Sequence, residues 1–331
     1  MNRLAAALVI VLVGSARADD GHGFMHRLAA EVRARLGDAA AARRPALVPP
    51  VPVAVHWKAQ RSGALDLGAP LVAMVGADLD GDGKGELYAV TAREVIAIGF
   101  AAGRPKELGR VAFAGDPAVP APRDVVGAAI VDGNAVIATV SSWARGLRVT
   151  WRGGQLVADP GEPGFALCAG EQAQLEPGKN FFGSGASVIY AARCRRDLVD
   201  AQGHPLHVRA ELAVTGKLDV SVETCAAGGA PCEPAVHHAY ADVGVAFELA
   251  DVDRDGTPEV IYAGAGAPGD PDTVRVVALG ADAKQARLRK TFTAGGVAGL
   301  AVVDVDGDRV QDVFAAVRLV GSTRVDLWRL D

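Results

Sequence analysis

From about residue 53 to the C-terminus, apolar residues occur in short runs of four to seven, and each run stops at Gly, Pro, Asp or Asn. Apolar runs of this length between turn-forming residues predict β-strands. No stretch of helical periodicity interrupts this part of the sequence, and only 5 % of all residues are aromatic. The pattern therefore predicts an all-β domain over residues 53–331.

The predicted strands fall into groups that repeat along the chain. They are 71–75, 87–90 and 95–98; 125–131, 135–140 and 147–151; 243–249, 260–263 and 274–279; 300–303, 313–317 and 325–330. Further units are expected across 165–194 and 207–224. Four strands in about 40 to 55 residues match a propeller blade. We predict a β-propeller of about six or seven four-stranded blades, in which strand 51–57 completes the last blade, because an open repeat would expose sheet edges.

The N-terminal segment 1–18 has the features of a secretory signal peptide. Arg3 precedes an apolar run from residue 4 to residue 13, and Ala16 and Ala18 make a small-x-small cleavage site. The run is shorter than the roughly 20 residues that a membrane-spanning helix needs, and no later run is long enough. We predict cleavage near Ala18, a secreted or periplasmic protein, and no membrane span.

Residues 19–44 are predicted to contain one helix, because Phe24, Leu28, Val32 and Leu36 follow one another at four-residue spacing. Prolines are frequent over residues 45–52, where they disfavour helix and favour an extended linker. The expected order is signal peptide, helix, linker and propeller.

Charge and cysteine content narrow the possible partners. The formal charge of −5 becomes −7 without Arg3 and Arg17 of the signal peptide, which argues against a nucleic-acid partner. The four cysteines suit disulfides in an oxidising compartment. Pairing Cys168 with Cys194 and Cys225 with Cys232 closes the smaller loops; a zinc site is the alternative.

Three segments place an acid on every other residue and join two predicted strands. Their acids are Asp78, Asp80, Asp82 and Glu86; Asp251, Asp253, Asp255 and Glu259; and Asp304, Asp306, Asp308 and Asp312. With a backbone carbonyl from Lys84, Thr257 or Val310, each segment offers the oxygen ligands that Ca²⁺ prefers. Without a cation, two carboxylates about 5 Å apart repel by roughly 3 kcal/mol at an effective dielectric near 20. The sequence therefore predicts three calcium loops.

Two other interpretations of these segments are weaker. Asp and Gly favour ordinary surface turns, but three copies with one ligand spacing argue for a metal. An EF-hand requires Glu at position 12 and flanking helices, whereas that position holds Ala89, Tyr262 and Ala315 between predicted strands. In the third loop, Arg309 replaces the glycine of the sharp turn, which predicts either a positive-φ strain of about 1 kcal/mol or another loop geometry, and a weak or empty site.

Residues 247–268 resemble the FG-GAP repeat of integrin α-subunit heads and its bacterial VCBS-type relatives. The acidic loop from Asp251 to Glu259 runs there into the small-residue segment from Gly264 to Pro268, and Phe182-Gly183 resembles a repeat entry. The resemblance implies a propeller whose loops bind Ca²⁺ between two strands of a blade, and it assigns the metal to the three acid sets named above.

No sequence motif for a catalytic nucleophile, a metalloprotease or a phosphate-binding loop is present. The four tryptophans could stack on sugar, but they are more often packing residues. We predict a binding, adhesion or scaffold module with structural calcium and a protein or carbohydrate ligand at one propeller face. A polysaccharide-active enzyme with its site at the channel is the alternative, and a structural component of a cell-surface assembly is a third possibility.

Overall fold

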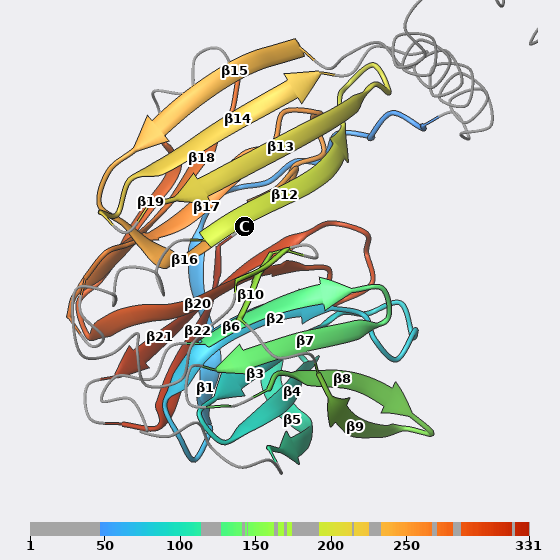
Figure 1. The fold of residues 1–331 in the computed structure, drawn as a ribbon, viewed down its shortest axis with the longest axis vertical. Helices are drawn as coiled ribbons and strands as arrows, with labels where there is room; N and C mark the ends of the chain where they lie inside the picture. The colour runs from blue at the N-terminus through green and yellow to red at the C-terminus, as the bar shows by residue number, and fades with distance from the viewer. Residues whose placement is uncertain are drawn as a thin grey trace, which may run out of the picture. The chain divides into compact units, whose positions relative to one another are not determined.

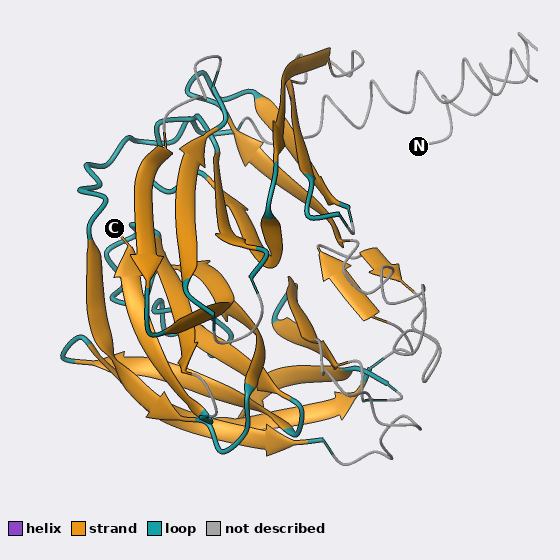
Figure 2. Cartoon of the chain, turned by 90° about the vertical axis from the view of Figure 1, so that its left-hand side faces the viewer, coloured by secondary structure: helices purple, strands orange, loops and turns teal. Residues whose placement is uncertain are grey.

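The computed structural model describes most of the predicted propeller (Figure 1). The described residues are 47–113, 127–140, 143, 145–161, 165–168, 171–173, 192–213, 215–224, 233–266, 270–280, 286–319 and 322–330. The predicted signal peptide, the helix over 19–44 and the start of the linker lie outside them. The described part consists of strands and connecting loops without a helix (Figure 2). It contains no helix long and apolar enough to cross a membrane.

The described strands form five four-stranded antiparallel sheets, which are the blades of a β-propeller. Blade 1 comprises β2 (Leu71–Ala77), β3 (Glu86–Thr91), β4 (Glu94–Ala101) and β5 (Arg104–Ala112); blade 2 comprises β6 (Gly127–Asp132), β7 (Ala135–Val140), β8 (Leu147–Arg152) and β9 (Gln155–Pro160). Blade 3 comprises β12 (Ala192–Val199), β13 (Pro205–Leu212), β14 (Leu218–Thr224) and β15 (Glu233–Tyr240); blade 4 comprises β16 (Val243–Ala250), β17 (Glu259–Gly264), β18 (Asp272–Ala278) and β19 (Ala286–Phe292). Blade 5 comprises β20 (Gly295–Val303), β21 (Asp312–Leu319), β22 (Arg324–Leu330) and β1 (Ala59–Asp66).

The prediction of six or seven blades is therefore wrong for the described residues, which hold five. The difference lies between blades 2 and 3, where a further unit was predicted across 165–194. The described residues there form a two-stranded sheet of β10 (Phe165–Cys168) and β11 (Glu171–Ala173), and β10 contacts β6 and β12. Residues 192–194 belong instead to the first strand of blade 3.

An N-terminal strand does complete the last blade, but the predicted segment is wrong. Strand β1 pairs antiparallel with β22 from Ala59↔Leu330 to Asp66↔Arg324, whereas residues 51–57 form no strand. Trp57 has a φ of 52°, which ends an extended conformation at that point. Strand β1 is the outer strand of its blade and is partly exposed along its length, so it lacks the apolar run that marks a buried strand.

The core is divided between neighbouring blades. One buried cluster joins blades 1 and 5 and includes Leu87, Ile98, Phe314 and Leu327. Similar clusters join blades 1 and 2, blades 3 and 4, and blades 4 and 5. The middle strands β3 and β7 are buried at every residue, which explains why they are continuous apolar runs in the sequence. This packing fixes the blade ends from which the three acidic loops extend.

Two of the tryptophans that could have stacked on sugar belong to this packing. Trp143 is buried and stacks on Phe113, with 4.6 Å between the ring centroids. Trp328 meets Phe292 edge-on at 5.4 Å.

Candidate metal centres

The three acidic loops connect the first and second strands of blades 1, 4 and 5. They lie between β2 and β3, between β16 and β17, and between β20 and β21, and none adjoins a helix. The sequence prediction of strand-to-strand loops is thus confirmed. The loops are also neighbours, because Gly85 donates its N–H to the Asp304 carbonyl at 2.5 Å and Arg254 Nη1 donates to the Arg309 carbonyl at 3.4 Å.

Each loop is held by the same pattern of backbone N–H donors to its own carboxylates. At position 1, Asp78 accepts from Gly81 and Gly83 at 2.8 and 3.0 Å, Asp304 accepts from Gly307 and Arg309 at 2.7 and 2.6 Å, and Asp251 accepts from Gly256 at 3.1 Å. At position 9, Glu86, Glu259 and Asp312 accept from the N–H of position 2 at 3.4, 2.9 and 3.0 Å. The shared pattern turns the side chains of each loop toward its interior.

Positions 4 and 6 of every loop have positive φ. The values are 77° and 86° at Gly81 and Gly83, 54° and 82° at Arg254 and Gly256, and 81° and 70° at Gly307 and Arg309. A non-glycine residue in this region costs roughly 1–2 kcal/mol. The strain predicted for Arg309 is therefore confirmed. That of Arg254 was missed, although glycine at position 4 of the other two loops was a signal for it.

All four predicted carboxylates converge in the first loop, and three of the four converge in each of the other two. In the first loop, ligand oxygens of all four predicted acids, Asp78, Asp80, Asp82 and Glu86, lie within 4.8 Å of one another. In the other loops, three acids converge in this way, namely Asp251, Asp253 and Asp255, and Asp304, Asp306 and Asp308. The acids at position 9 of these two loops, Glu259 and Asp312, are not part of the convergent groups.

An arginine lies against the acids of the second loop. Arg287 of β19 contacts Asp253 through Nη1, and its Nη2 lies 3.0 Å from Asp255 and 3.3 Å from Glu259. Glu259 is completely buried, so it needs a positive charge or a proton nearby. The guanidinium group thus contacts three of the four predicted ligands and supplies a cation from within the chain.

An arginine also lies against the acids of the third loop, but it comes from the third strand of its blade. Arg329 of β22 contacts Asp312, which is 1 % exposed, and lies 3.5 Å from Asp306. Arg329 stands opposite Phe314 in the sheet register, two residues beyond Asp312. The arginine side chain is therefore on the same face of the blade as the acid.

The first loop has no comparable arginine. Within the described ranges, no basic side chain forms an ion pair with its four acids. The register position equivalent to Arg329 is Ala97, which stands opposite Tyr88 and is buried. Glu86 accepts instead from the Tyr88 hydroxyl at 2.8 Å, and Trp151 Nε1 donates to that hydroxyl at 2.7 Å.

Burial and mutual repulsion make ionisation of these acids unfavourable without a cation. Desolvation raises the pKa of Glu86 to about 7, of Asp251 to about 6 and of Glu259 to about 8. These values include a smaller upward contribution from neighbouring aspartates. A bound divalent ion would reverse this effect by favouring the charged carboxylates.

The donor set fits a hard cation. Every predicted side-chain ligand is a carboxylate, and Asp251 Oδ1 is buried without a hydrogen-bond partner. Oxygen-only ligands suit Ca²⁺ and Mg²⁺ rather than zinc or copper.

At position 7, Lys84, Thr257 and Val310 donate their N–H groups to the position-5 aspartates. Their predicted carbonyl ligation stays a prediction.

The predicted disulfides stay untested. Cys168 lies in β10 and Cys194 in β12, but their side chains are outside the described part, and Cys225 and Cys232 lie outside it entirely.

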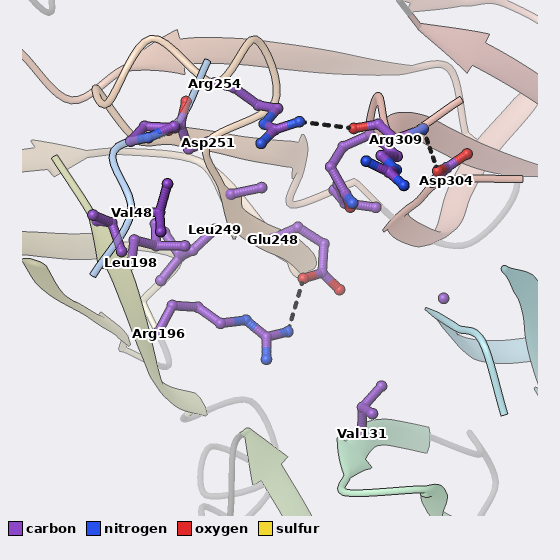
Figure 3. Close-up of a pocket in the computed structure, with 16 residues that line it drawn as sticks. Val48, Val131, Arg196, Leu198, Glu248, Leu249, Asp251, Arg254, Asp304 and Arg309 are labelled. Atoms are coloured by element: carbon purple, nitrogen blue, oxygen red, sulfur yellow. Dashed lines mark hydrogen bonds and ion pairs between the residues drawn. The ribbon is translucent and has the colours of Figure 1, made fainter. Parts of the chain in front are cut away.

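A cavity of about 800 Å³ adjoins these loops (Figure 3). The first strand of every blade contributes to its wall through Gly76, Val131, Leu198, Leu249 and Val302. The cavity is therefore the axial channel of the propeller. Its polar wall includes Arg196, Arg254 and Arg309, which the sequence analysis did not single out as site residues.

Comparisons with known proteins give neither a family nor a function for this chain. No protein family and no curated protein matches the chain. Among solved structures, the PQQ-bound form of aldose sugar dehydrogenase from Streptomyces coelicolor is similar over 84 % of this chain and 99 % of that chain, with 16 % identity and a TM-score of 0.41. A likeness at this level says nothing about the site, so function has to be argued from the residues themselves.

Proposed function

We propose that this protein is a secreted or periplasmic calcium-binding β-propeller of the FG-GAP/VCBS type that serves as a binding, adhesion or scaffold module. One observation carries the proposal: four carboxylates of the first loop converge within 4.8 Å, and no described basic side chain neutralises them. At an effective dielectric near 20, each close pair costs roughly 3 kcal/mol in repulsion. A divalent cation removes this cost.

The ion is proposed to be structural. Each loop joins the first two strands of a blade, and its position-9 acid already belongs to the second strand or borders it. In the first loop, where positions 1, 3, 5 and 9 converge, an ion held by these four acids links the loop to the strand and stabilises that hairpin. Calcium is preferred to magnesium, since a flexible loop with several carboxylates suits its six to eight ligands at about 2.3–2.6 Å.

Thermal melting with calcium and with a chelator tests this proposal. Extracellular modules bind calcium with a Kd of about 10⁻⁴–10⁻³ M. At about 10 mM calcium, linkage then gives roughly 1.4–2.7 kcal/mol for each site. We expect a melting temperature roughly 3 to 8 °C higher in calcium than in chelator. Superimposable melting curves in the two conditions would remove the metal from the proposal.

The ligand-binding role is supported by the axial channel, whose wall combines apolar side chains with a few charged ones. Binding of glycans or proteins without turnover would agree with a binding module. Release of reducing ends from a polysaccharide would instead establish the catalytic alternative.

A further inference from the structure

Two arginines extend from the acidic loops into the axial channel. Arg254 occupies position 4 of the second loop and Arg309 occupies position 6 of the third, and both line the cavity (Figure 3). Arg254 Nη1 donates to the Arg309 carbonyl at 3.4 Å, so the two residues adjoin across the boundary between blades 4 and 5. Gln311 of the third loop adds an amide to the same wall.

Both arginines stand where the backbone favours glycine. Their φ values are 54° and 70°, whereas the first loop has Gly81 and Gly83 at the same two positions. The loop therefore forms with glycine at both positions, and the fold does not require an arginine at either. Strain that is retained where glycine would relieve it points to a role for the side chain.

Neither of these two arginines forms an ion pair within the described structure, although Glu248, Asp251 and Asp304 also line the cavity. No described carboxylate lies within ion-pairing distance of either guanidinium group, whereas Arg196 in the same cavity pairs with Glu248 at 3.5 Å. Asp251 and Asp304 line the same cavity, but neither forms an ion pair with these arginines. Asp304 accepts two backbone N–H groups of its own loop, and Asp251 accepts one.

We propose that Arg254 and Arg309 form an oxyanion-binding site in the axial channel for a sugar-sized ligand that carries a carboxylate or a phosphate. Guanidinium groups bind both anions through paired N–H donors. The apolar wall, including Val48, Leu198 and Leu249, would contact the non-polar face of such a ligand. This inference names the ligand class for the proposed binding module and rests on that proposal.

Binding of four sugars tests the site, measured by calorimetry on the whole protein at saturating calcium. Galacturonate presents a carboxylate, galactose 6-phosphate and glucose 6-phosphate present a phosphate, and galactose is the neutral control. We expect at least one acidic sugar to bind tenfold or more tightly than galactose. Comparison of galacturonate with the two sugar phosphates then identifies which anion the site binds. Equal affinity for galactose and all three acidic sugars would overturn the inference.

The double variant Arg254→Gly with Arg309→Gly separates binding from folding. We expect its affinity for the acidic sugar to fall to the level of galactose, while its melting temperature stays level or rises because the strain is relieved. Arg289→Gln, an exposed arginine of β19 outside the cavity wall, is the matched charge control and should bind as the wild type does.

Unchanged acidic-sugar affinity in the double glycine variant would contradict the proposed site. A lower melting temperature with unchanged affinity would show that the arginines are structural. The calcium-dependent melting shift is measured without sugar, so it can persist when this inference fails. Equal melting temperatures in calcium and in chelator would instead contradict the calcium proposal.

Discussion

The first acidic loop and the other two share one backbone design but differ in what neutralises their acids. All three place N–H donors on the carboxylates at positions 1 and 9. In the second and third loops, an arginine from the fourth or the third strand of the same blade contacts the acids, while the first loop has only neutral donors among the described residues. A loop of this design can thus be balanced by a side chain as well as by an ion.

This difference ranks the three loops by their need for calcium. The first has no substitute for the ion and should respond to it most strongly. In the second and third loops, an ion has to displace Arg287 or Arg329 from the carboxylates before it can bind. Their calcium affinity should be lower for that reason, independent of the strain at Arg309.

The largest effect is expected from Arg287→Ala. The change removes the cation from buried Asp253 and Glu259, and loss of one partner of such a pair costs about 3 kcal/mol or more in unfolding free energy at a pH above the Glu259 pKa of about 8, where both carboxyl groups are ionised. Urea unfolding in chelator should show this loss, and calcium should restore at least half of it by taking the place of the guanidinium group.

Arg289→Ala in the same strand is the control, because Arg289 is exposed and has no described ion-pair partner. If Arg287→Ala lowered the free energy of unfolding by the same amount with and without calcium, the ion would not replace the arginine.

A smaller effect is expected from Asp80→Asn in the first loop. It removes one ligand charge, so the protein should lose the roughly 1.4–2.7 kcal/mol that calcium contributes at that site, and lose nothing in chelator. Asp306→Asn is the corresponding change in the third loop, where the exposed pair with Arg329 contributes about 0–1 kcal/mol. If the two variants lost the same calcium-dependent stability, the ranking of the loops would be wrong.

The smallest effect is expected from Arg309→Gly, which makes position 6 of the third loop like that of the first. Relief of the positive-φ strain should raise stability by about 1 kcal/mol in chemical denaturation. Gly83→Ala is the reverse change. A Cβ there would have open space around it, so a loss of about 1 kcal/mol would come from backbone strain alone.

The buried strands and the acidic loops were predictable because their signals are local. Strands such as β3 are apolar throughout, and the alternating acids occur at fixed spacing. The closing strand was misplaced because β1 lies at a blade edge, where polar residues such as Gln60 and Arg61 are tolerated. The sequence could suggest which acids belong to one loop, but it could not reveal their partners.

Arg287 and Arg329 illustrate that limit. They lie 28 and 17 residues after the position-9 acids that they contact. Arg287 is on the fourth strand of its blade, whereas Arg329 is on the third strand of its blade. No common spacing links either arginine to its loop. The axial arginines are a different case, because a non-glycine residue at a position that is glycine in another loop is visible in an alignment of the three repeats.

Calorimetric titration with calcium tests the division between the loops most directly. We predict that the wild type binds one ion with the highest affinity and that Asp80→Asn abolishes that binding. Arg287→Gln and Arg329→Gln should each strengthen one further site by about tenfold. Three equivalent sites in the wild type, with no change in either arginine variant, would contradict the proposed role of the arginines.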